Sequence, residues 1–198
     1  PVRTVIGRDA VVGRTTGLAA SPESGTSSAF AIQAKVLPVG SGGAGITGTR
    51  GIMQEASVQD AYRFVTENAT KLGISEEVVR TRRVNVHEEK RWGGGDGPSA
   101  GAAITIAIIS AFLGDPVDQS VAITGTIQAD GKVGKVGAVA LKVAAAHRAG
   151  RSLVFIPESN ANDITTLPDS VVDALTIRPV RHIDEILAAA LVLQRAAS

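Results

Sequence analysis

Residues 98–113 restrict the fold more than any other stretch, because they are apolar almost throughout. A helix over these residues has no polar face to turn toward water, so it must lie inside a hydrophobic core. The chain has 198 residues, which is enough for one domain with such a core. The stretch is too short to cross a bilayer, since a spanning helix needs roughly 20 apolar residues.

The rest of the chain mixes strand and helix patterns without a repeat, which predicts one α/β (α+β) domain over residues 1–198. Strands are expected near residues 10–20, 28–39, 83–87, 121–127, 153–156 and 175–179. Further helices are expected over residues 53–72, 138–149 and 183–193. Residues 40–51 are rich in glycine and are expected to form a loop. Gly40–Gly45 matches a dinucleotide-binding pattern, but no helix begins on the last glycine, so a hairpin loop is favoured.

Composition excludes several classes of protein. The formal net charge is +1 and aromatic residues make up 3%, which argues against a nucleic-acid-binding surface. The chain has no cysteine, so disulfides, thiol nucleophiles and thiolate metal sites are excluded. Histidine, aspartate and glutamate show no metal-ligand spacing. The lack of cysteine fits a reducing compartment. The chain starts at Pro1, without Met or a signal peptide, so we expect a piece of a longer polypeptide.

Ser99 is the first candidate for chemistry, because glycines surround it at the start of the buried helix. Glycines allow a sharp turn and a close approach of a ligand. Pro98 suits the first helical turn, and free N–H groups at a helix start can stabilise an oxyanion. These features suit a nucleophile, although a simple helix cap is the favoured explanation of the serine taken alone.

A serine nucleophile needs a base, and Lys142 is the candidate. The histidines His87, His147 and His182 show no serine-hydrolase arrangement, and no Gly-x-Ser-x-Gly elbow occurs. On the helix expected over residues 138–149, the neighbours of Lys142 at helical spacing are all apolar. Burial would lower the pKa of this lysine and leave an amine able to accept a proton. A lysine whose head reaches water is the alternative.

Thr124 and Thr126 alternate along the strand expected over residues 121–127, so both hydroxyls are expected on one face. One of them is a candidate partner for the lysine amine, whereas ordinary strand propensity is the alternative. No phosphate-binding loop occurs, because Gly131-Lys132 and Gly134-Lys135 are each followed by valine. Any ATP site is therefore expected outside this chain.

These residues together resemble the Lon-type proteases. Asp96–Gly101 is similar to their nucleophile motif, Thr124-Gly125 to their strand threonine, and Gly137–Lys142 to the start of their lysine-bearing helix. The helix end at 144–150 and the segments 14–19, 53–56 and 154–157 also resemble the family. The similarity follows the family's order along nearly the whole chain.

The resemblance implies a compact Lon-protease-like domain with mixed sheets and packed helices, in which Ser99 attacks a peptide carbonyl and Lys142 is the general base. It implies that Thr124 supports the lysine and that backbone N–H groups near Ser99 hold the oxyanion. Asp96 and Gly97 flank the nucleophile, and Asp96 is expected to shape this loop or simply to stabilise its turn. His87 is a candidate supporting residue, with a core or surface role as the alternative.

The chain departs from the family at several positions. Asn85 precedes Val86-His87 where His-x-His is common, Thr126 follows Thr-Gly where many members have Glu, and Gln33 replaces a strand glutamate. Ala138 replaces the second glycine before the lysine helix. None of these positions is one of the two expected catalytic residues.

The resemblance implies a serine endopeptidase for unfolded or damaged proteins that works in a homo-oligomeric ring, a hexamer in the family. ATP and Mg²⁺ are expected only in an ATPase module outside this chain, so we expect no cofactor, no metal, no membrane and no nucleic acid here. The implied location is the cytoplasm or another reducing compartment such as the mitochondrial matrix. Alternatives are a stand-alone ATP-independent peptidase and a non-catalytic ring-assembly module of the same fold.

Overall fold

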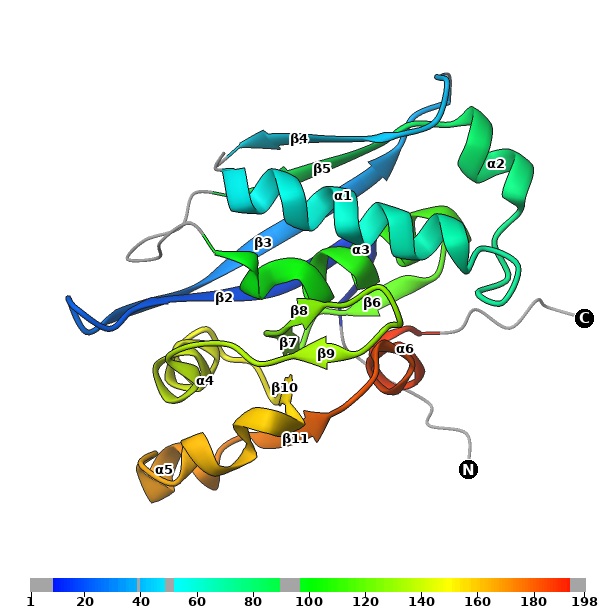
Figure 1. Cartoon of the computed structure of the whole chain (residues 1–198). Coiled ribbons are helices and arrows are strands. Elements are labelled where there is room, and N and C mark those ends of the chain that lie inside the picture. Colours follow the sequence, from blue (N-terminus) through cyan, green and yellow to red (C-terminus); the bar gives the residue numbers. More distant parts are fainter. Residues whose placement is uncertain (1–8, 39, 49–51, 90–96, 193–198) are drawn as a thin grey trace, which may run out of the picture.

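The computed structural model describes residues 9–38, 40–48, 52–89 and 97–192. Its main feature is a seven-stranded mixed sheet in the order β11-β10-β7-β2-β3-β5-β4 (Figure 1). The strands β11, β10, β7 and β2 run parallel, β3 is antiparallel to both β2 and β5, and β4 is parallel to β5. Two small sheets, β1-β6 and β8-β9, accompany it. The predicted α/β class is confirmed.

The elements have the following bounds. The strands are β1 Ala10–Val12, β2 Arg14–Ser21, β3 Thr26–Val36, β4 Ala44–Gly48, β5 Val84–Glu88, β6 Pro116–Asp118, β7 Val121–Ile123, β8 Thr126–Ile127, β9 Val133–Gly134, β10 Leu153–Pro157 and β11 Thr176–Val180. The helices are α1 Ile52–Glu67, α2 Glu76–Thr81, α3 Gly101–Leu113, α4 Val139–Arg148, α5 Asp169–Val172 and α6 Ile183–Ala190, with the 3-10 segments η1 Pro98–Ala100 and η2 Glu158–Ile164.

Side-chain alternation on the central strands separates the core into two layers. Since successive side chains of a strand point to opposite faces, each strand can feed both layers. One face of the sheet packs against α1, α3 and α6 and includes Ala19, Ile123 and Phe155. The other packs against α4 and α5 and includes Leu18, Ala122 and Val154. The two helical layers therefore lie on opposite faces of the central strands.

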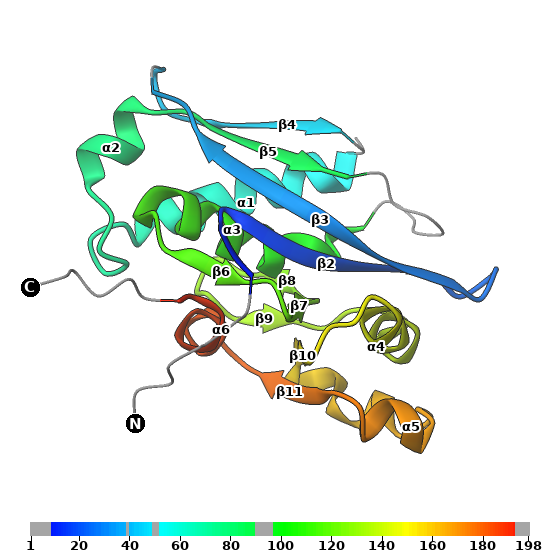
Figure 2. The same ribbon diagram turned by 180° about the vertical axis from the view of Figure 1, so that it is seen from behind.

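The outer half of the sheet is covered on its α1 and α3 face. The side chains of Phe30, Ile32 and Ala34 are buried, while the residues between them on β3 are only partly buried. Figure 2 shows β3, β4 and β5 in front of α1 and α3, which lie behind them. Within the described segments, no helix is long and apolar enough to cross a membrane.

The buried helix predicted over residues 98–113 is confirmed as η1 followed by α3. All residues of α3 from Gly101 to Ser110 are buried, and the helix ends at Gly114, whose φ of 76° is the left-handed conformation typical of a glycine C-cap. The helix α4 and the strands β10 and β11 also lie where the patterns indicated, within one or two residues.

Three expectations are wrong. Residues 40–45 do not form a hairpin loop, because β5 lies between β3 and β4 in the sheet. The strand expected over residues 121–127 ends at Ile123 and restarts as β8 in another sheet, because Gly125 forms its hydrogen bonds with the chain around Ser99. Residues 44–48, expected in a loop, form the edge strand β4 because pairing with β5 supplies their backbone hydrogen bonds. A Cβ on Gly45 would lie 2.9 Å from Oδ1 of Asn85, so a larger residue here would require the Asn85 side chain to move. The helix α2 was not predicted, although Ser75 caps it and Glu76 and Glu77 begin it.

A close contact joins the start of α3 to the segment that follows β7. The N–H of Gly125 donates to the carbonyl of Ser99 at 2.9 Å, and the N–H of Ala102 donates to the carbonyl of Gly125 at 2.9 Å. No side chain fits between these segments. A Cβ on Gly101 would lie 2.9 Å from the backbone nitrogen of Ile127, closer than real Cβ contacts come.

We predict that Gly101→Ala destabilises the protein although alanine is the better helix former. The helical preference favours alanine by about 1 kcal/mol, but forcing a methyl group against the Ile127 backbone costs about 1–3 kcal/mol. Thermal unfolding should show a lower Tm, by a few degrees for a domain of this size. The control is Gly137→Ala, whose Cβ would meet no atom within 4 Å. An unchanged Tm for Gly101→Ala would contradict the proposed close contact.

Candidate active site

A cavity of about 280 Å³ lies between β2, the start of the buried helix and α4. Five parts of the chain line it. The β2 strand and its turn contribute Ala19, Ala20 and Pro22, and the start of the buried helix contributes Gly97, Pro98 and Ser99. The remaining walls are Thr126 of β8, the stretch 135–138 after β9, and Lys142 of α4. Sequence patterns had singled out Ser99 and Lys142, but not the wall formed by β2.

Ser99 is held at the edge of this cavity by the turn of η1. Gly97 precedes it in an extended conformation, and Pro98 occupies the first position of the turn. The carbonyl of Ser99 accepts the hydrogen bond from Gly125, so its backbone is fixed from the side of β8. Ser99 itself is half-buried and Ala100 is buried, so the side chain lies at a boundary between core and solvent.

Lys142 lies on the core-facing side of α4, as its apolar neighbours predicted. Val139, Val143, Ala145 and Ala146 are the other buried residues of this helix, and Lys142 is only 4% exposed. Its backbone N–H donates to the carbonyl of Ala138 at 3.1 Å, which anchors the residue to the first turn. With so little of the residue exposed, burial disfavours the charged ammonium group.

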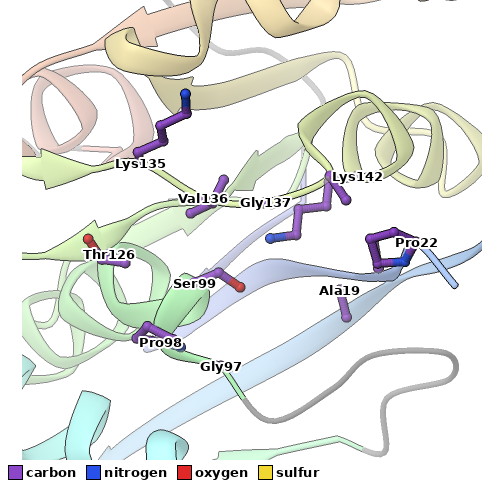
Figure 3. A pocket seen from close by; sticks show the side chains of 12 residues that line it. Ala19, Pro22, Gly97, Pro98, Ser99, Thr126, Lys135, Val136, Gly137 and Lys142 are labelled. Carbon is purple, nitrogen blue, oxygen red and sulfur yellow. The ribbon is translucent and has the colours of Figure 1, made fainter.

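The side chains of Ser99 and Lys142 converge from opposite layers of the domain. Figure 3 shows the Ser99 hydroxyl and the Lys142 amine pointing toward one another across the cavity, while the side chain of Lys135 points away from them. Lys135 is exposed and has Asp163 as a distant ion-pair partner, at 4.0 Å. Lys142 is therefore the amine that faces the serine, and Lys135 is a cation at the outer wall.

The two threonines lie in different surroundings, contrary to the expectation that they share one strand face. Thr126, on β8, lines the cavity, with its side chain directed away from Ser99 in Figure 3. Thr124 follows the end of β7, and its N–H donates to the carbonyl of Phe155 at 3.0 Å. The Thr124 side chain is completely buried, and within the described ranges its hydroxyl oxygen has no hydrogen-bond partner. A buried hydroxyl without a partner costs about 1–3 kcal/mol.

The other expected site residues are not gathered in the cavity to the same degree. Gly97 lines it, whereas Asp96 lies outside the described residues. His87 is exposed on β5, where its Nδ1 lies 3.0 Å from the hydroxyl of Thr47, and it does not line the cavity. This placement favours the surface role for His87. Across the described residues, no group of three or more His, Asp or Glu side chains is arranged to hold a metal ion.

Ala138 carries the only positive φ among the non-glycine residues of the described segments, 54°. It lines the cavity and begins the helix that carries Lys142. The left-handed conformation brings Cβ too close to the following carbonyl oxygen in L-residues and costs about 1–2 kcal/mol. The glycine expected at this position of similar sequences would avoid that cost, so the backbone beside the lysine is strained in this chain.

We predict that Ala138→Gly raises stability slightly. The relief of about 1–2 kcal/mol of strain is offset in part by about 0.5–1 kcal/mol of additional chain entropy in the unfolded state. The Tm should therefore rise by a few degrees at most. The matched control is Ala140→Gly, inside the same helix, which should lose about 1 kcal/mol. A loss of stability in both variants would show that Ala138 is not strained.

Comparison with known proteins identifies relatives of this chain. A family model described as the Lon protease (S16) C-terminal proteolytic domain matches residues 3–193. A Lon protease of Neorickettsia sennetsu is 40% identical over 177 residues, which are 89% of this chain and 21% of the relative. The Lon proteases of Erwinia amylovora and Escherichia coli (strain K12) are each 38% identical over 180 residues, covering 91% of this chain and 23% of theirs. The chain thus spans about a fifth of the length of these relatives.

Proposed function

The chain belongs to the Lon protease (S16) family, as its C-terminal proteolytic domain, and on that premise we propose that it is a serine endopeptidase with Ser99 as nucleophile and Lys142 as base. Family membership supports a protease, hence a hydrolase. One observation carries the residue assignment: the hydroxyl of Ser99 and the amine of a buried lysine face each other in one cavity.

In this proposal, the neutral amine of Lys142 takes the proton of the Ser99 hydroxyl as its oxygen attacks the peptide carbonyl. The protonated lysine then gives that proton to the leaving amine, and an acyl-enzyme remains. Water hydrolyses the ester in a second round, with Lys142 again acting as base. The burial of Lys142 supports this role, because an amine removed from water is more easily kept neutral.

The oxyanion formed during attack needs donors that are not already engaged. The N–H of Gly101 donates to the carbonyl of Pro98, and that of Ala102 donates to the carbonyl of Gly125. We therefore assign oxyanion stabilisation to the N–H of Ser99, at the positive end of the helix, because Pro98 before it has no N–H. The role of Gly97 in this assignment is to let the backbone approach the substrate closely.

Thr124 is proposed as the partner of the lysine amine. Its buried hydroxyl lacks a partner in the described structure and can both donate and accept. Accepting a hydrogen bond from the amine would orient the nitrogen lone pair toward Ser99. Thr126 is less favoured as the partner of the lysine amine, because its side chain is directed away from the serine. Asp96 and His87 receive no role here.

We also propose the wider setting from family membership. The substrates are unfolded polypeptides, because nothing in the sequence of this chain couples nucleotide hydrolysis to unfolding, and ATP and Mg²⁺ act in a separate module. The working assembly is a homo-oligomeric ring, a hexamer, in the cytoplasm or another reducing compartment. A stand-alone, ATP-independent peptidase would use the same site and differ only in lacking the ATPase module.

We predict that Ser99→Ala folds normally and loses peptide cleavage, because it removes the attacking oxygen. The rate should fall on the order of 10⁴-fold or more. The measurement is casein degradation without ATP, with the exposed Ser170→Ala as control. Wild type should cleave casein and spare a stably folded protein, whose cleavage depends on its rare open state. A folded Ser99→Ala protein that keeps substantial activity would refute the assignment.

We predict that Lys142→Arg is inactive, because a guanidinium group stays protonated and cannot accept the serine proton. In wild type, kcat/KM should rise with pH, since only the deprotonated amine is a base, and the apparent pKa should lie below the ~10.4 of an exposed lysine. The control is Lys71→Arg, an exposed lysine that pairs with Asp184. Activity in Lys142→Arg, or a pH profile that stays flat from acid to alkaline, would contradict a lysine base.

A further inference from the structure

Asn160 is a completely buried side chain that binds the backbone of the cavity wall. It lies in η2, on the segment that follows β10, and its exposure is 0%. The N–H of Val136 donates to its Oδ1 at 3.0 Å, and its Nδ2 donates to the carbonyl of Val136 at 2.9 Å. The side-chain amide thus pairs with one residue through a donor and an acceptor, as a neighbouring strand would.

The orientation of this amide is fixed by its partners. The Val136 N–H can only donate, so it must face the oxygen and not the nitrogen of Asn160. The second hydrogen on Nδ2 points to the carboxylate of Asp163, at 2.7 Å. That carboxylate is 45% exposed and is the ion-pair partner of Lys135, the residue before Val136. Both hydrogens of the amide are therefore used, and only glutamine carries the same donors and acceptor, on a side chain one methylene longer.

The residue held by Asn160, Val136, lies two positions before Ala138, the strained start of the lysine helix. Val136 and Gly137 line the cavity, and Ala138 follows with its positive φ. The carbonyl of Ala138 accepts the hydrogen bond from the N–H of Lys142. The path from Asn160 to the proposed base therefore runs through the two hydrogen bonds to Val136, along the chain from Val136 to Ala138, and through the hydrogen bond from Lys142 to Ala138.

We propose that Asn160 is a positioning residue for the peptidase reaction: it clamps Val136 so that the 136–138 wall and the Lys142 amine stay aligned with Ser99. The strain at Ala138 makes this clamp necessary, because a left-handed alanine persists only where its surroundings hold it. Release of Val136 would let the segment relax and shift the first turn of α4. The inference rests on the proposed Ser99 and Lys142 reaction.

The test is steady-state cleavage of a short unfolded peptide by Asn160→Ala, with kcat and KM measured separately over pH. A misplacement of about 1 Å can lower a rate about 10²-fold, so we expect kcat to fall by about ten- to a hundredfold, with an altered pH profile. Amide hydrogen exchange should show that Val136 loses protection. The control is Val171→Ala, which removes buried apolar volume from the core cluster that also contains Val136 but removes no hydrogen bond to residues 135–138.

Two further variants keep the proposal testable if Asn160→Ala does not fold. Asp163→Ala removes the outer support of the amide at a partly exposed position, and kcat should fall less than in Asn160→Ala. Asn160→Asp keeps an acceptor for the Val136 N–H but sets a carboxylate against Asp163. Adding Asp163→Asn supplies a donor to that carboxylate, so the double variant should recover part of the kcat lost in Asn160→Asp.

The outcomes separate this inference from the proposed function. If Ser99→Ala abolishes cleavage but every folded Asn160 and Asp163 variant matches Val171→Ala in kcat and pH profile, Asn160 is only structural and the inference is overturned. If wild type cleaves no peptide, or Ser99→Ala still cleaves, the proposed function itself fails. A lower kcat with an altered pH profile and partial rescue in the double variant supports the positioning role.

Discussion

The structure depends on the contact between Gly125 and the start of the buried helix. At this point the chain leaves β7, and instead of continuing along the sheet it forms two backbone hydrogen bonds with Ser99 and Ala102. Buried backbone N–H and C=O groups need hydrogen-bond partners. The bonds with Ser99 and Ala102 replace those of a continuing strand, so the chain changes direction without leaving the Gly125 backbone unpaired. It fixes the serine and also starts the β8-β9 hairpin that leads to the lysine helix. Glycine at 101 and 125 is required because a Cβ at either position would collide with β8 or β9.

The separation of the core into two layers explains how a buried amine reaches a serine. α3 packs on one face of the central strands and α4 on the other, so neither helix alone could bring both groups together. The side chains of Ser99 and Lys142 face the same cavity beyond the end of β7, where the chain has left the main sheet to form the β8-β9 hairpin. Because Lys142 lies among the buried apolar residues of α4, most of its side chain is removed from water. The same packing that stabilises the fold therefore prepares the chemistry that we propose.

The wall between the hairpin and α4 combines strain with support. Ala138 adopts a conformation that alanine tolerates poorly, and Asn160 holds the residue two positions earlier through both of its backbone groups. Because the Asn160 amide pairs with Val136 as a neighbouring strand would, Val136 can line the cavity while its backbone N–H and carbonyl remain hydrogen-bonded. Strained backbone at a site is kept only where neighbouring contacts over-determine it. Stability and alignment are thus linked at one short segment.

The sequence by itself determined the buried helix, the lysine on an apolar helical face and the order of most elements, because these follow from local periodicity and from glycine and proline signals. It also placed Ser99 and Lys142 as a pair through their resemblance to one family. Only the tertiary structure decided that the strand after Ile123 breaks, that residues 44–48 pair as an edge strand and that β2 forms a wall of the cavity. The roles that we propose for Thr124 and Asn160 involve residues far away in the chain, Lys142 and Val136. Local pattern cannot reveal such partners, because hydrogen bonds between distant segments override the propensity of a few residues.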